Sequence, residues 1–261
     1  MPRMVSRSHT HSIRRGAHEP TGIRNQMVKV NVTTKEIRVF TPPPPNPLGD
    51  LQPFNDFNSG PHGMYFTQTT GNVITYFDYA TEQFTNYPVP TPLSGPLGMF
   101  YASDGMAYFA EFLGQKLGRL DPATGVITEF ALPASLLGPA VIRVETEGRY
   151  IWFTAFVGNG LGRFDMQTHE ITAYTYDSPL AFPAEDTLSA DGRIWASTAT
   201  QNTLIYFNQS TDAFTAIVKP QTAVVAPVSL PFEFNIGINY GPGDAVWFTE
   251  AITNRIGRYQ L

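Results

Sequence analysis

Residues 107–133 read AYFAEFLGQKLGRLDPATGVITEFALP, and variants of this stretch recur along the chain of 261 residues. It joins short segments in which apolar and polar residues alternate, a pattern typical of half-buried β-strands. The turn from Asp121 to Thr124 separates the last two segments. Asp or Asn opens such a turn because its short side chain can hydrogen-bond the backbone two residues on. The stretch therefore predicts short strands joined by tight turns.

The turn is repeated, and so is a strand that precedes it. Asp or Asn followed three residues later by Thr occurs five times with a period of about 43 residues, ending at Thr34, Thr81, Thr124, Thr168 and Thr211. The repeated strands read MYFTQ (64–68), AYFAE (107–111), IWFTA (151–155), IWAST (194–198) and VWFTE (246–250). Four short antiparallel strands at this period describe a blade of a β-propeller.

The sequence thus predicts an all-β protein, a β-propeller of four-stranded antiparallel blades. Five second-strand repeats are visible, with a further split or partial blade, so we expect five or six blades. Residues 23–31 and 35–40 read as a third and a fourth strand, whereas the chain stops at Leu261 after a third strand. The segment 35–40 completes the last blade, or a sixth blade stays incomplete, or a longer parent has lost its first blades. We expect residues 1–22 to form a basic, disordered tail and residues 23–261 to form a single β-propeller domain.

Composition excludes several classes of site. The chain has no cysteine, so it has no disulfide, no thiolate metal site and no cysteine nucleophile. Its net charge of −5 argues against a nucleic-acid groove. No apolar run approaches the roughly 18 residues of a transmembrane helix, and no apolar segment follows the basic N-terminus as in a signal peptide. We therefore expect a cytoplasmic monomer that binds neither nucleic acid nor membrane.

Two stretches resemble the blade signature of the streptogramin B lyase (virginiamycin B lyase) family. VWFTEAITNRIGRY (246–259) resembles its first half, and LGRLDPATGVITEFALP (117–133) resembles its second half. The resemblance spans about residues 23–261 and implies a propeller, which in that family has seven blades. It further implies an enzyme that opens the macrocyclic ester of a depsipeptide antibiotic by elimination. In the family a magnesium ion is held by glutamates and a histidine is the general base.

The chain departs from the family where those histidines stand, in a Pro-His-Gly-Ile motif at the start of innermost strands. The matching segments are 53–56, 96–99, 183–186 and 235–238, and their histidine positions hold Phe54, Leu97, Ala184 and Ile236. The third unit needs a one-residue shift and gives Ala140 or Val141. The metal glutamate before the motif corresponds to Phe234 in the last unit, with Glu233 beside it.

Glu250 and Glu111 keep the glutamate that ends the family's second strand. We expect both on the face where loops converge on the propeller axis. A carboxylate there can bind a hard cation, or it can transfer a proton if burial raises its pKa. We therefore predict Glu250 and Glu111 as catalytic residues and Glu250 with Glu233 as ligands of Mg²⁺. The alternative for each is a hydrogen-bonded or solvated carboxylate at a strand end.

Apolar residues near the same face predict a pocket for a hydrophobic small molecule. The predicted lining is Phe54, Leu97, Phe112, Phe156, Ala184, Glu185, Phe234 and Ile236. Packing between blades is the alternative for each aromatic ring. Glu185, Asp186 and Glu233 either form a small acidic cluster with Glu250 or are blade-edge residues that face solvent or cap loop amides. The pattern places His62 and His169 in turns on the opposite face, away from the expected site.

Three hypotheses of function remain open at this point. The first is an enzyme of specialised or antibiotic metabolism that acts on a hydrophobic cyclic molecule by elimination, ring opening or cyclisation. The second is a propeller that binds a ligand or holds one conformer without acid–base chemistry. The third is a scaffold that uses one face for protein partners, which requires a large exposed apolar patch.

Overall fold

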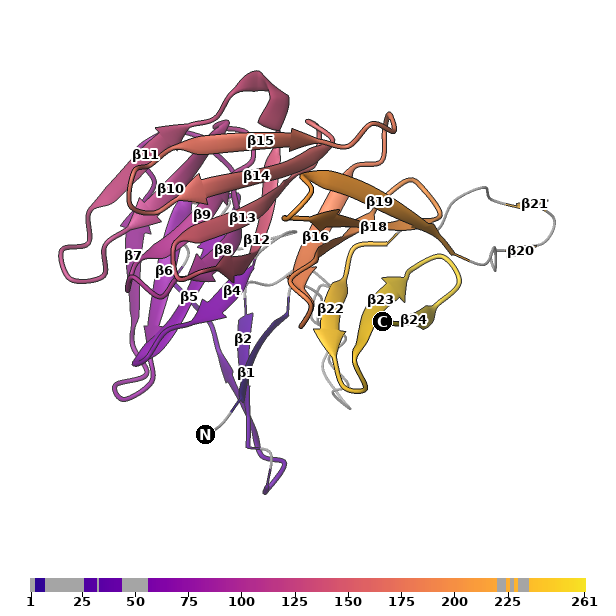
Figure 1. Cartoon of the computed structure of the whole chain (residues 1–261). Coiled ribbons are helices and arrows are strands. Elements are labelled where there is room, and N and C mark those ends of the chain that lie inside the picture. Colours follow the sequence, from indigo (N-terminus) through magenta and orange to yellow (C-terminus); the bar gives the residue numbers. More distant parts are fainter. Residues whose placement is uncertain are drawn as a thin grey trace.

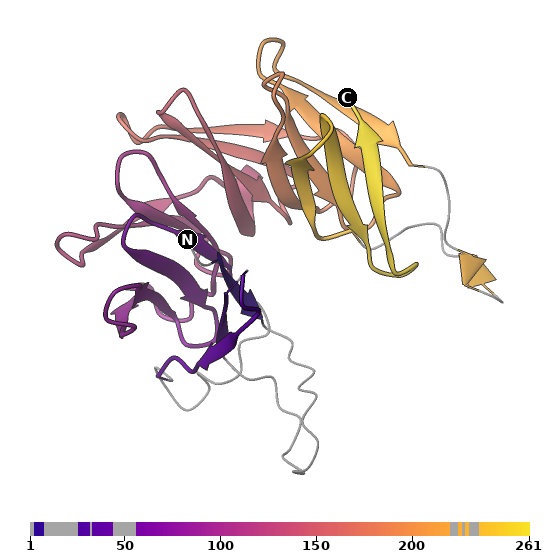
Figure 2. The ribbon, with the colours of Figure 1, turned by 90° about the horizontal axis from the view of Figure 1, so that it is seen from below.

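The computed structural model describes residues 3–7, 26–31, 33–43, 56–219, 224–225, 228–229 and 235–261. These residues form β-strands and one single-turn helix, η1 (Ala134–Leu136), so the all-β prediction is confirmed. None of them forms a helix that is long and apolar enough to span a membrane. Successive sheets follow one another around an arc, which Figures 1 and 2 show from two directions.

Four sheets of the arc have four antiparallel strands each, joined in chain order. Blade 1 contains β4 (Phe57–Ser59), β5 (Gly63–Gln68), β6 (Val73–Asp78) and β7 (Phe84–Pro88). Blade 2 contains β8 (Pro96–Tyr101), β9 (Ala107–Glu111), β10 (Lys116–Leu120) and β11 (Ile127–Ala131). Blade 3 contains β12 (Pro139–Thr146), β13 (Tyr150–Ala155), β14 (Gly160–Asp165) and β15 (Ile171–Thr175). Blade 4 contains β16 (Pro183–Leu188), β17 (Ile194–Thr198), β18 (Thr203–Asn208) and β19 (Ala213–Val218).

The two ends of the arc are three-stranded. The N-terminal sheet has the order β1 (Arg3–Arg7), β2 (Gln26–Val30), β3 (Ile37–Phe40), and blade 5 has β22 (Ile238–Gly241), β23 (Ala245–Glu250) and β24 (Arg255–Gln260). A separate hairpin consists of β20 (Val224–Val225) and β21 (Val228–Ser229). Because β3 pairs with β2, the expectation that it completes the last blade is wrong, and the incomplete sixth blade is the arrangement found. Among the described residues no strand pairs with the outer edge of β24.

The predicted turns form as their side chains require. Asp78 Oδ1 accepts backbone N–H bonds from Ala80 and Thr81 at 2.9 and 2.7 Å, and Asn31 Oδ1 accepts the equivalent pair. Asp121, Asp165 and Asn208 open the other three turns in the same way. These hydrogen bonds lower the pKa of Asp78, so the group stays anionic. The repeat seen in the sequence is therefore a repeat of one hydrogen-bonded turn.

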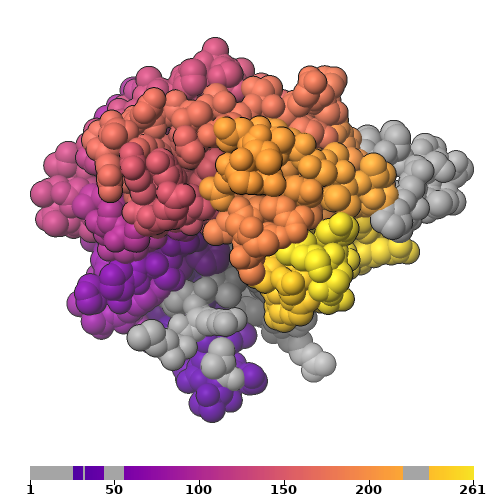
Figure 3. Space-filling model, in the orientation of Figure 1, coloured from indigo at the N-terminus to yellow at the C-terminus, as the bar shows by residue number. Residues whose placement is uncertain are grey.

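Most of the apolar core lies between neighbouring blades. Trp152 and Trp195 are fully buried there, and the indole N–H of each donates to a hydroxyl, Thr146 or Ser189, at 3.0 Å. Within a blade, a large side chain on one strand lies opposite a glycine on the next strand. A Cβ atom at Gly162 would lie 2.1 Å from the Phe153 ring that pairs across from it. Such matching fills the space within each blade, and Figure 3 shows residues 56–219, violet through magenta to orange, as a continuous outer surface.

A hydroxyl on the second strand joins each of three blades to the next. Thr154 Oγ1 accepts the N–H of Val141 at 3.1 Å and donates to the carbonyl of Ala184 in blade 4 at 3.1 Å. The same two bonds are made by Thr67 in blade 1 and Ser197 in blade 4. Blade 2 has Ala110 at this position and lacks the hydroxyl. The Thr of the repeated WFT segment is therefore a connection between blades at the innermost strand.

We predict that Thr154→Val destabilises the protein by about 1–3 kcal/mol, because it leaves a buried N–H and a buried carbonyl without partners at little change in volume. Urea unfolding followed by tryptophan fluorescence measures the change. Thr128→Val on the exposed outer strand β11 is the matched control, with an expected change within about 0.5 kcal/mol. Equal effects of the two substitutions would contradict the role given to Thr154.

Candidate functional site

The loops that follow second strands and those that precede innermost strands lie together on one face, which we call the loop face. Backbone N–H groups of Phe112 and Phe156 donate to the carbonyls of Gly95 and Gly138 at 3.2 and 2.9 Å. Blade 4 repeats the bond between Ala199 and Phe182. The same face carries the starts of the innermost strands. This arrangement confirms the sequence expectation that the two kinds of loop converge.

Apolar side chains crowd the loop face. The Phe112 and Phe156 rings lie 6.3 Å apart, and Phe156 stacks on Phe182 with ring centroids 5.1 Å apart. Leu113 and Leu180 beside them are 71% and 66% exposed. We call these five residues the apolar rim. Phe112 and Phe156 were predicted for the pocket and are brought together, whereas Phe182 was missed because nothing in its Pro-flanked loop marks its direction.

The other predicted pocket residues have different surroundings. Leu97 is half-buried and its carbonyl accepts the Thr67 hydroxyl at 2.8 Å. Ala184 is buried, and its carbonyl accepts the Thr154 hydroxyl. Ile236 is 44% exposed. The predicted residues Phe54, Phe234 and Glu233 lie outside the described residues.

Innermost strands carry β-bulges near their starts, and an additional bulge sits in blade 3. On β12, Ile142 lies opposite Phe153 and Val144 opposite Trp152, so Arg143 is an extra residue in the ladder. Neither β8 nor β16 has this second irregularity. A bulged residue is released from the alternation of the strand, so its side chain can be redirected. This extra residue explains why the third repeat aligns with the others only after a shift of one residue.

Arg143 reaches the innermost residues of two other blades. Its Nη2 lies 3.0 Å from Asp56 Oδ1 of blade 1 and 3.5 Å from Glu185 Oε1 of blade 4. Asp56 Oδ2 accepts the N–H of Met99 in blade 2 at 3.2 Å, and Glu185 Oε2 accepts that of Ile238 in blade 5 at 3.3 Å. We call Asp56, Arg143 and Glu185 the axial belt, because their contacts connect all five blades at the innermost strands.

The position of Asp56 corrects the sequence alignment of the first blade. Phe57 lies opposite Phe66 as Met99 lies opposite Phe109. Phe57, and not Asp56, is therefore the counterpart of Met99. The count along the sequence matched Pro53 to the proline of the motif, and it was one residue off because the ladder of blade 1 is shifted by one residue. The shift places Asp56 level with Glu185, where it can contact Arg143.

Burial dominates the electrostatics of the belt. It raises the pKa of Asp56 above the usual range, although Arg143 and the N–H groups of Met99 and Phe57 oppose the change. Burial also raises the pKa of Glu185, against the opposing charge of Arg143. The Glu185 side chain remains 20% exposed and that of Arg143 33% exposed. The belt thus presents a carboxyl of raised pKa and a guanidinium to the same space.

Asp186 is fully buried beside the belt. Neither of its carboxylate oxygens has a hydrogen-bond partner in the described part of the chain. Blades 2, 3 and 5 hold Met99, Ile142 and Ile238 at the same ladder position. Burial therefore raises the pKa of Asp186 well above its usual value, with Arg143 opposing and Glu185 adding to the rise. The reading of Asp186 as a solvent-facing edge residue is wrong.

Glu111 is fully buried at the end of β9 in blade 2. Both of its carboxylate oxygens lack hydrogen-bond partners among the described residues. Burial, followed by the charge of Glu129, raises its pKa to about 7, while Lys116 and Ser94 act against the rise. Lys116 and Glu129 lie on the outer strands β10 and β11. The raised pKa of Glu111 suits acid–base chemistry. Because Glu111 is fully buried, however, it is separated from a ligand on the loop face.

Glu250 is paired with a lysine that sequence reasoning missed. Its Oε1 lies 3.9 Å from Lys219 Nζ, and its Oε2 accepts the Thr253 hydroxyl at 3.4 Å. Lys219 is 4% exposed and its ammonium also lies 5.1 Å from the centroid of Phe248. Glu111 and Glu250 stand in different blades with different neighbours.

These surroundings do not fit a magnesium ion. Mg²⁺ requires several oxygen ligands around one point, whereas the described partners of Glu250 are an ammonium and a hydroxyl. Arg143 already supplies the cation between Asp56 and Glu185. No group of three acidic or histidine side chains suited to a metal occurs among the described residues. We derive no step through a metal.

The described histidines lie on the face opposite the loop face, as the pattern predicted. The carbonyl of His62 accepts the N–H of Tyr79, which joins the β4–β5 turn to the β6–β7 turn. His169 follows Thr168 in a repeat turn, and its ring stacks on Phe164 with centroids 5.9 Å apart. Neither is placed to contact the axial belt.

We predict that Glu111→Gln removes part of the pH dependence of stability. An unfolded glutamate ionises near pH 4.5, whereas native Glu111 keeps its proton to about pH 7. The native state therefore binds the extra proton, and wild-type stability falls as the pH rises between these values, at about 1.4 kcal/mol per pKa unit. Glutamine cannot ionise and lacks this loss.

Urea unfolding at about pH 5 and pH 8 tests this prediction. The loss of stability between the two should be smaller in Glu111→Gln than in wild type. Glu147→Gln in an exposed turn is the control and should retain the wild-type loss. Parallel profiles for Glu111→Gln and wild type would show that native Glu111 is ionised throughout.

Comparison with known proteins agrees with this architecture. A model of the Virginiamycin B lyase family matches residues 57–206. No curated protein sequence gives a significant match. A selenomethionine-substituted virginiamycin B lyase from Staphylococcus aureus is 25% identical, with a TM-score of 0.66 over 79% of this chain and 69% of that chain.

Two further structures show the fold. A catalytically inactive virginiamycin B lyase from Staphylococcus aureus with quinupristin, in which a histidine is replaced by alanine, is 21% identical. Its TM-score is 0.79, over 99% of this chain and 85% of that chain. A streptogramin B lyase is 24% identical, with a TM-score of 0.72 over 93% of this chain and 78% of that chain. Since the family model covers more than half of the sequence, the chain belongs to the virginiamycin B lyase family.

Proposed function

We propose that this protein acts on a hydrophobic, cyclic small molecule of specialised or antibiotic metabolism, by elimination, ring opening or cyclisation. The observation that carries the proposal is the paired carboxyl and guanidinium of Glu185 and Arg143 in a propeller whose loop face carries apolar side chains. A pocket for such a ligand combines apolar lining with a few polar groups that fix its orientation. The apolar rim supplies the apolar lining. Arg143 and Glu185 supply the polar groups.

Binding on the apolar rim follows from the hydrophobic effect. Burial of exposed apolar surface contributes roughly 25 cal/mol per Å², and Leu113 and Leu180 leave most of their side chains in water. A macrocyclic lactone with aromatic or aliphatic substituents has surface of the same kind. The related lyase structure with quinupristin supports a ligand of this class.

Glu185 is the residue we assign to proton transfer. Its raised pKa favours it as a base at neutral pH. In an elimination it takes a proton from the carbon next to the one bearing the ester oxygen. The carbon–oxygen bond then breaks, and its electron pair leaves on the ester carboxylate. Arg143 stabilises the negative oxygen that develops, as a guanidinium binds carboxylates.

Glu250 and Glu111 have supporting roles in this proposal. Glu250 balances the buried charge of Lys219, and Glu111 sets the pH dependence of blade 2 stability. Magnesium is implied by the family resemblance alone. Isothermal titration with Mg²⁺ tests it, because saturable binding lost in Glu250→Gln would establish the carboxylate site and its absence would agree with the described donors.

We predict that Glu185→Gln lowers kcat for ring opening by about 100-fold or more, the usual contribution of a positioned general base. The probes are quinupristin and a panel of hydrophobic macrocyclic lactones, with products identified by mass spectrometry. Phe156→Ala should raise KM with a smaller change in kcat, since it removes binding surface. Glu147→Gln is the control and should leave both constants unchanged.

Other outcomes distinguish the alternatives. If Phe156→Ala abolishes conversion while Glu185→Gln does not, the protein holds a conformer without acid–base chemistry. The internal pairing of Glu185 with Arg143 is the observation that favours this second function. If wild type neither binds nor converts any probe, the proposal is contradicted. The exposed rim would then be a surface for a protein partner.

A further inference from the structure

A cation lies against an aromatic side chain in blades 2 to 5, on the outer strands away from the axial belt. Arg163 lies 4.7 Å from the ring centroid of Tyr150 and 5.7 Å from those of Trp152 and Tyr174. Arg193 lies 4.8 Å from the centroid of Tyr206. In blade 2 the Arg119 guanidinium lies over the ring of Phe130. In blade 5 the Arg258 guanidinium lies over the ring of Trp247.

The arginine comes from one of two repeat positions. In blades 2, 3 and 5 it lies on the third strand, directly opposite the aromatic residue of the second strand, as Arg163 lies opposite Trp152. In blade 4 the third strand has Tyr206 instead, and Arg193 just before β17 takes over. An arginine from either of two repeat positions thus places a guanidinium against an aromatic ring in each of these blades.

Blade 1 has the aromatic site and neither arginine. Tyr65 lies opposite Tyr76, as Trp152 lies opposite Arg163. The position that precedes the second-strand repeat holds Gly63, where blade 4 has Arg193. No cation of the described residues lies over the rings of this site.

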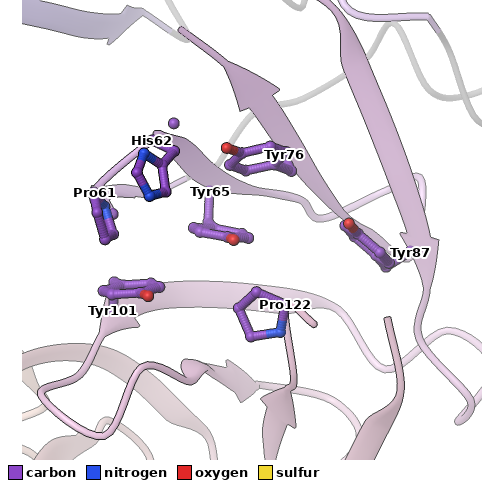
Figure 4. Close-up of a pocket in the computed structure, with 9 residues that line it drawn as sticks. Pro61, His62, Tyr65, Tyr76, Tyr87, Tyr101 and Pro122 are labelled. Atoms are coloured by element: carbon purple, nitrogen blue, oxygen red, sulfur yellow. The ribbon is translucent and has the colours of Figure 1, made fainter. Parts of the chain in front are cut away.

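The site in blade 1 is a cleft with four tyrosines. Tyr65 and Tyr76 have ring centroids 4.7 Å apart, and Tyr101 of blade 2 stacks on Tyr65 at 5.6 Å with an angle of 15°. Tyr87 completes the set, and the cleft has a volume of about 220 Å³. Figure 4 shows the four rings around one space, with Pro61, His62 and Pro122 at its margins.

The charges around the cleft favour a cation. The Tyr76 hydroxyl donates to Asp78 Oδ2 at 3.5 Å, and the pKa of Asp78 is lowered by its turn hydrogen bonds. Asp121 precedes Pro122 in the chain, and its pKa is lowered in the same way. Burial raises the pKa of Tyr65, so its phenol stays neutral. Aromatic faces attract cations, and the Asp78 carboxylate beside Tyr76 adds to the attraction, whereas the charge of Arg119 acts on Asp121.

We propose that the tyrosine cleft between blades 1 and 2 binds an external organic cation of the guanidinium type. The ligand takes the place that arginine side chains fill in the other four described blades. The guanidinium group belongs either to a small free guanidine or to an arginine of a peptide, and the two sources share this chemistry. The site lies apart from the loop face and does not depend on the function proposed for it.

The test is a titration with methylguanidinium, followed by NMR of tyrosine-labelled protein at about pH 8, where an imidazole is largely uncharged. Methylurea is the matched neutral probe, since it is planar and of similar size. We expect saturable shifts of tyrosine ring signals at millimolar methylguanidinium, and at least about tenfold weaker binding of methylurea. An acetylated and amidated Gly-Arg-Gly peptide is the second arm, and tighter binding of it assigns the ligand to a peptide.

Two variants connect the result to the cleft. Tyr76→Arg restores the arginine of the sister blades, so it should abolish binding while the protein stays folded. Tyr101→Leu should weaken binding about tenfold or more by removing one ring. Tyr150→Leu in the site that Arg163 already fills is the control and should bind like wild type. Absence of saturation, equal binding of methylurea, or undiminished binding by Tyr76→Arg would overturn the proposal.

Discussion

The arrangement of the innermost strands depends on the charge of Arg143. The Arg143 side chain, which is 33% exposed, lies between carboxylates of two other blades, and its removal would leave the buried Asp56 carboxylate without its cation. Because Asp56 and Glu185 also accept backbone N–H groups of the blades next to them, the charges reach every complete blade. Hydroxyls such as that of Thr154 add neutral connections slightly farther out.

This belt also gives the chain a site that differs from the family pattern. The histidine positions of blades 2 to 5 hold apolar residues, and Glu250, which was expected as a metal ligand, is paired with Lys219. A fixed guanidinium can stabilise developing negative charge without a metal. In the proposed function the apolar rim binds the hydrophobic ring of the ligand. The chain therefore combines an inherited architecture with an internally balanced set of charges.

Much of the fold could be predicted from the sequence because it depends on local chemistry. Asx turns such as the one at Asp78 and the alternation of 107–111 are set by neighbouring residues. The loop-face location of Phe112 and Phe156 follows from the order of strands in a blade. These features repeat with the blade, so five copies reinforce one interpretation.

The candidate site was harder to predict because it depends on exceptions to the repeat. Arg143 looks like an exposed strand residue, and only the extra residue of its bulge redirects it. Asp186 occupies a position that belongs to the core in other blades, but an aspartate is not expected in a core from its polarity. The pairing of Lys219 with Glu250 joins residues of two different segments whose contact no local pattern encodes.

A double-mutant cycle between Asp56→Asn and Arg143→Gln tests the axial belt most directly. The free energy of unfolding in urea is measured for wild type, both single variants and the double variant. If the 3.0 Å ion pair organises the innermost strands, the two substitutions should couple by about 1–3 kcal/mol. Effects that add to within about 0.5 kcal/mol would show that the two charges do not interact and would contradict the account.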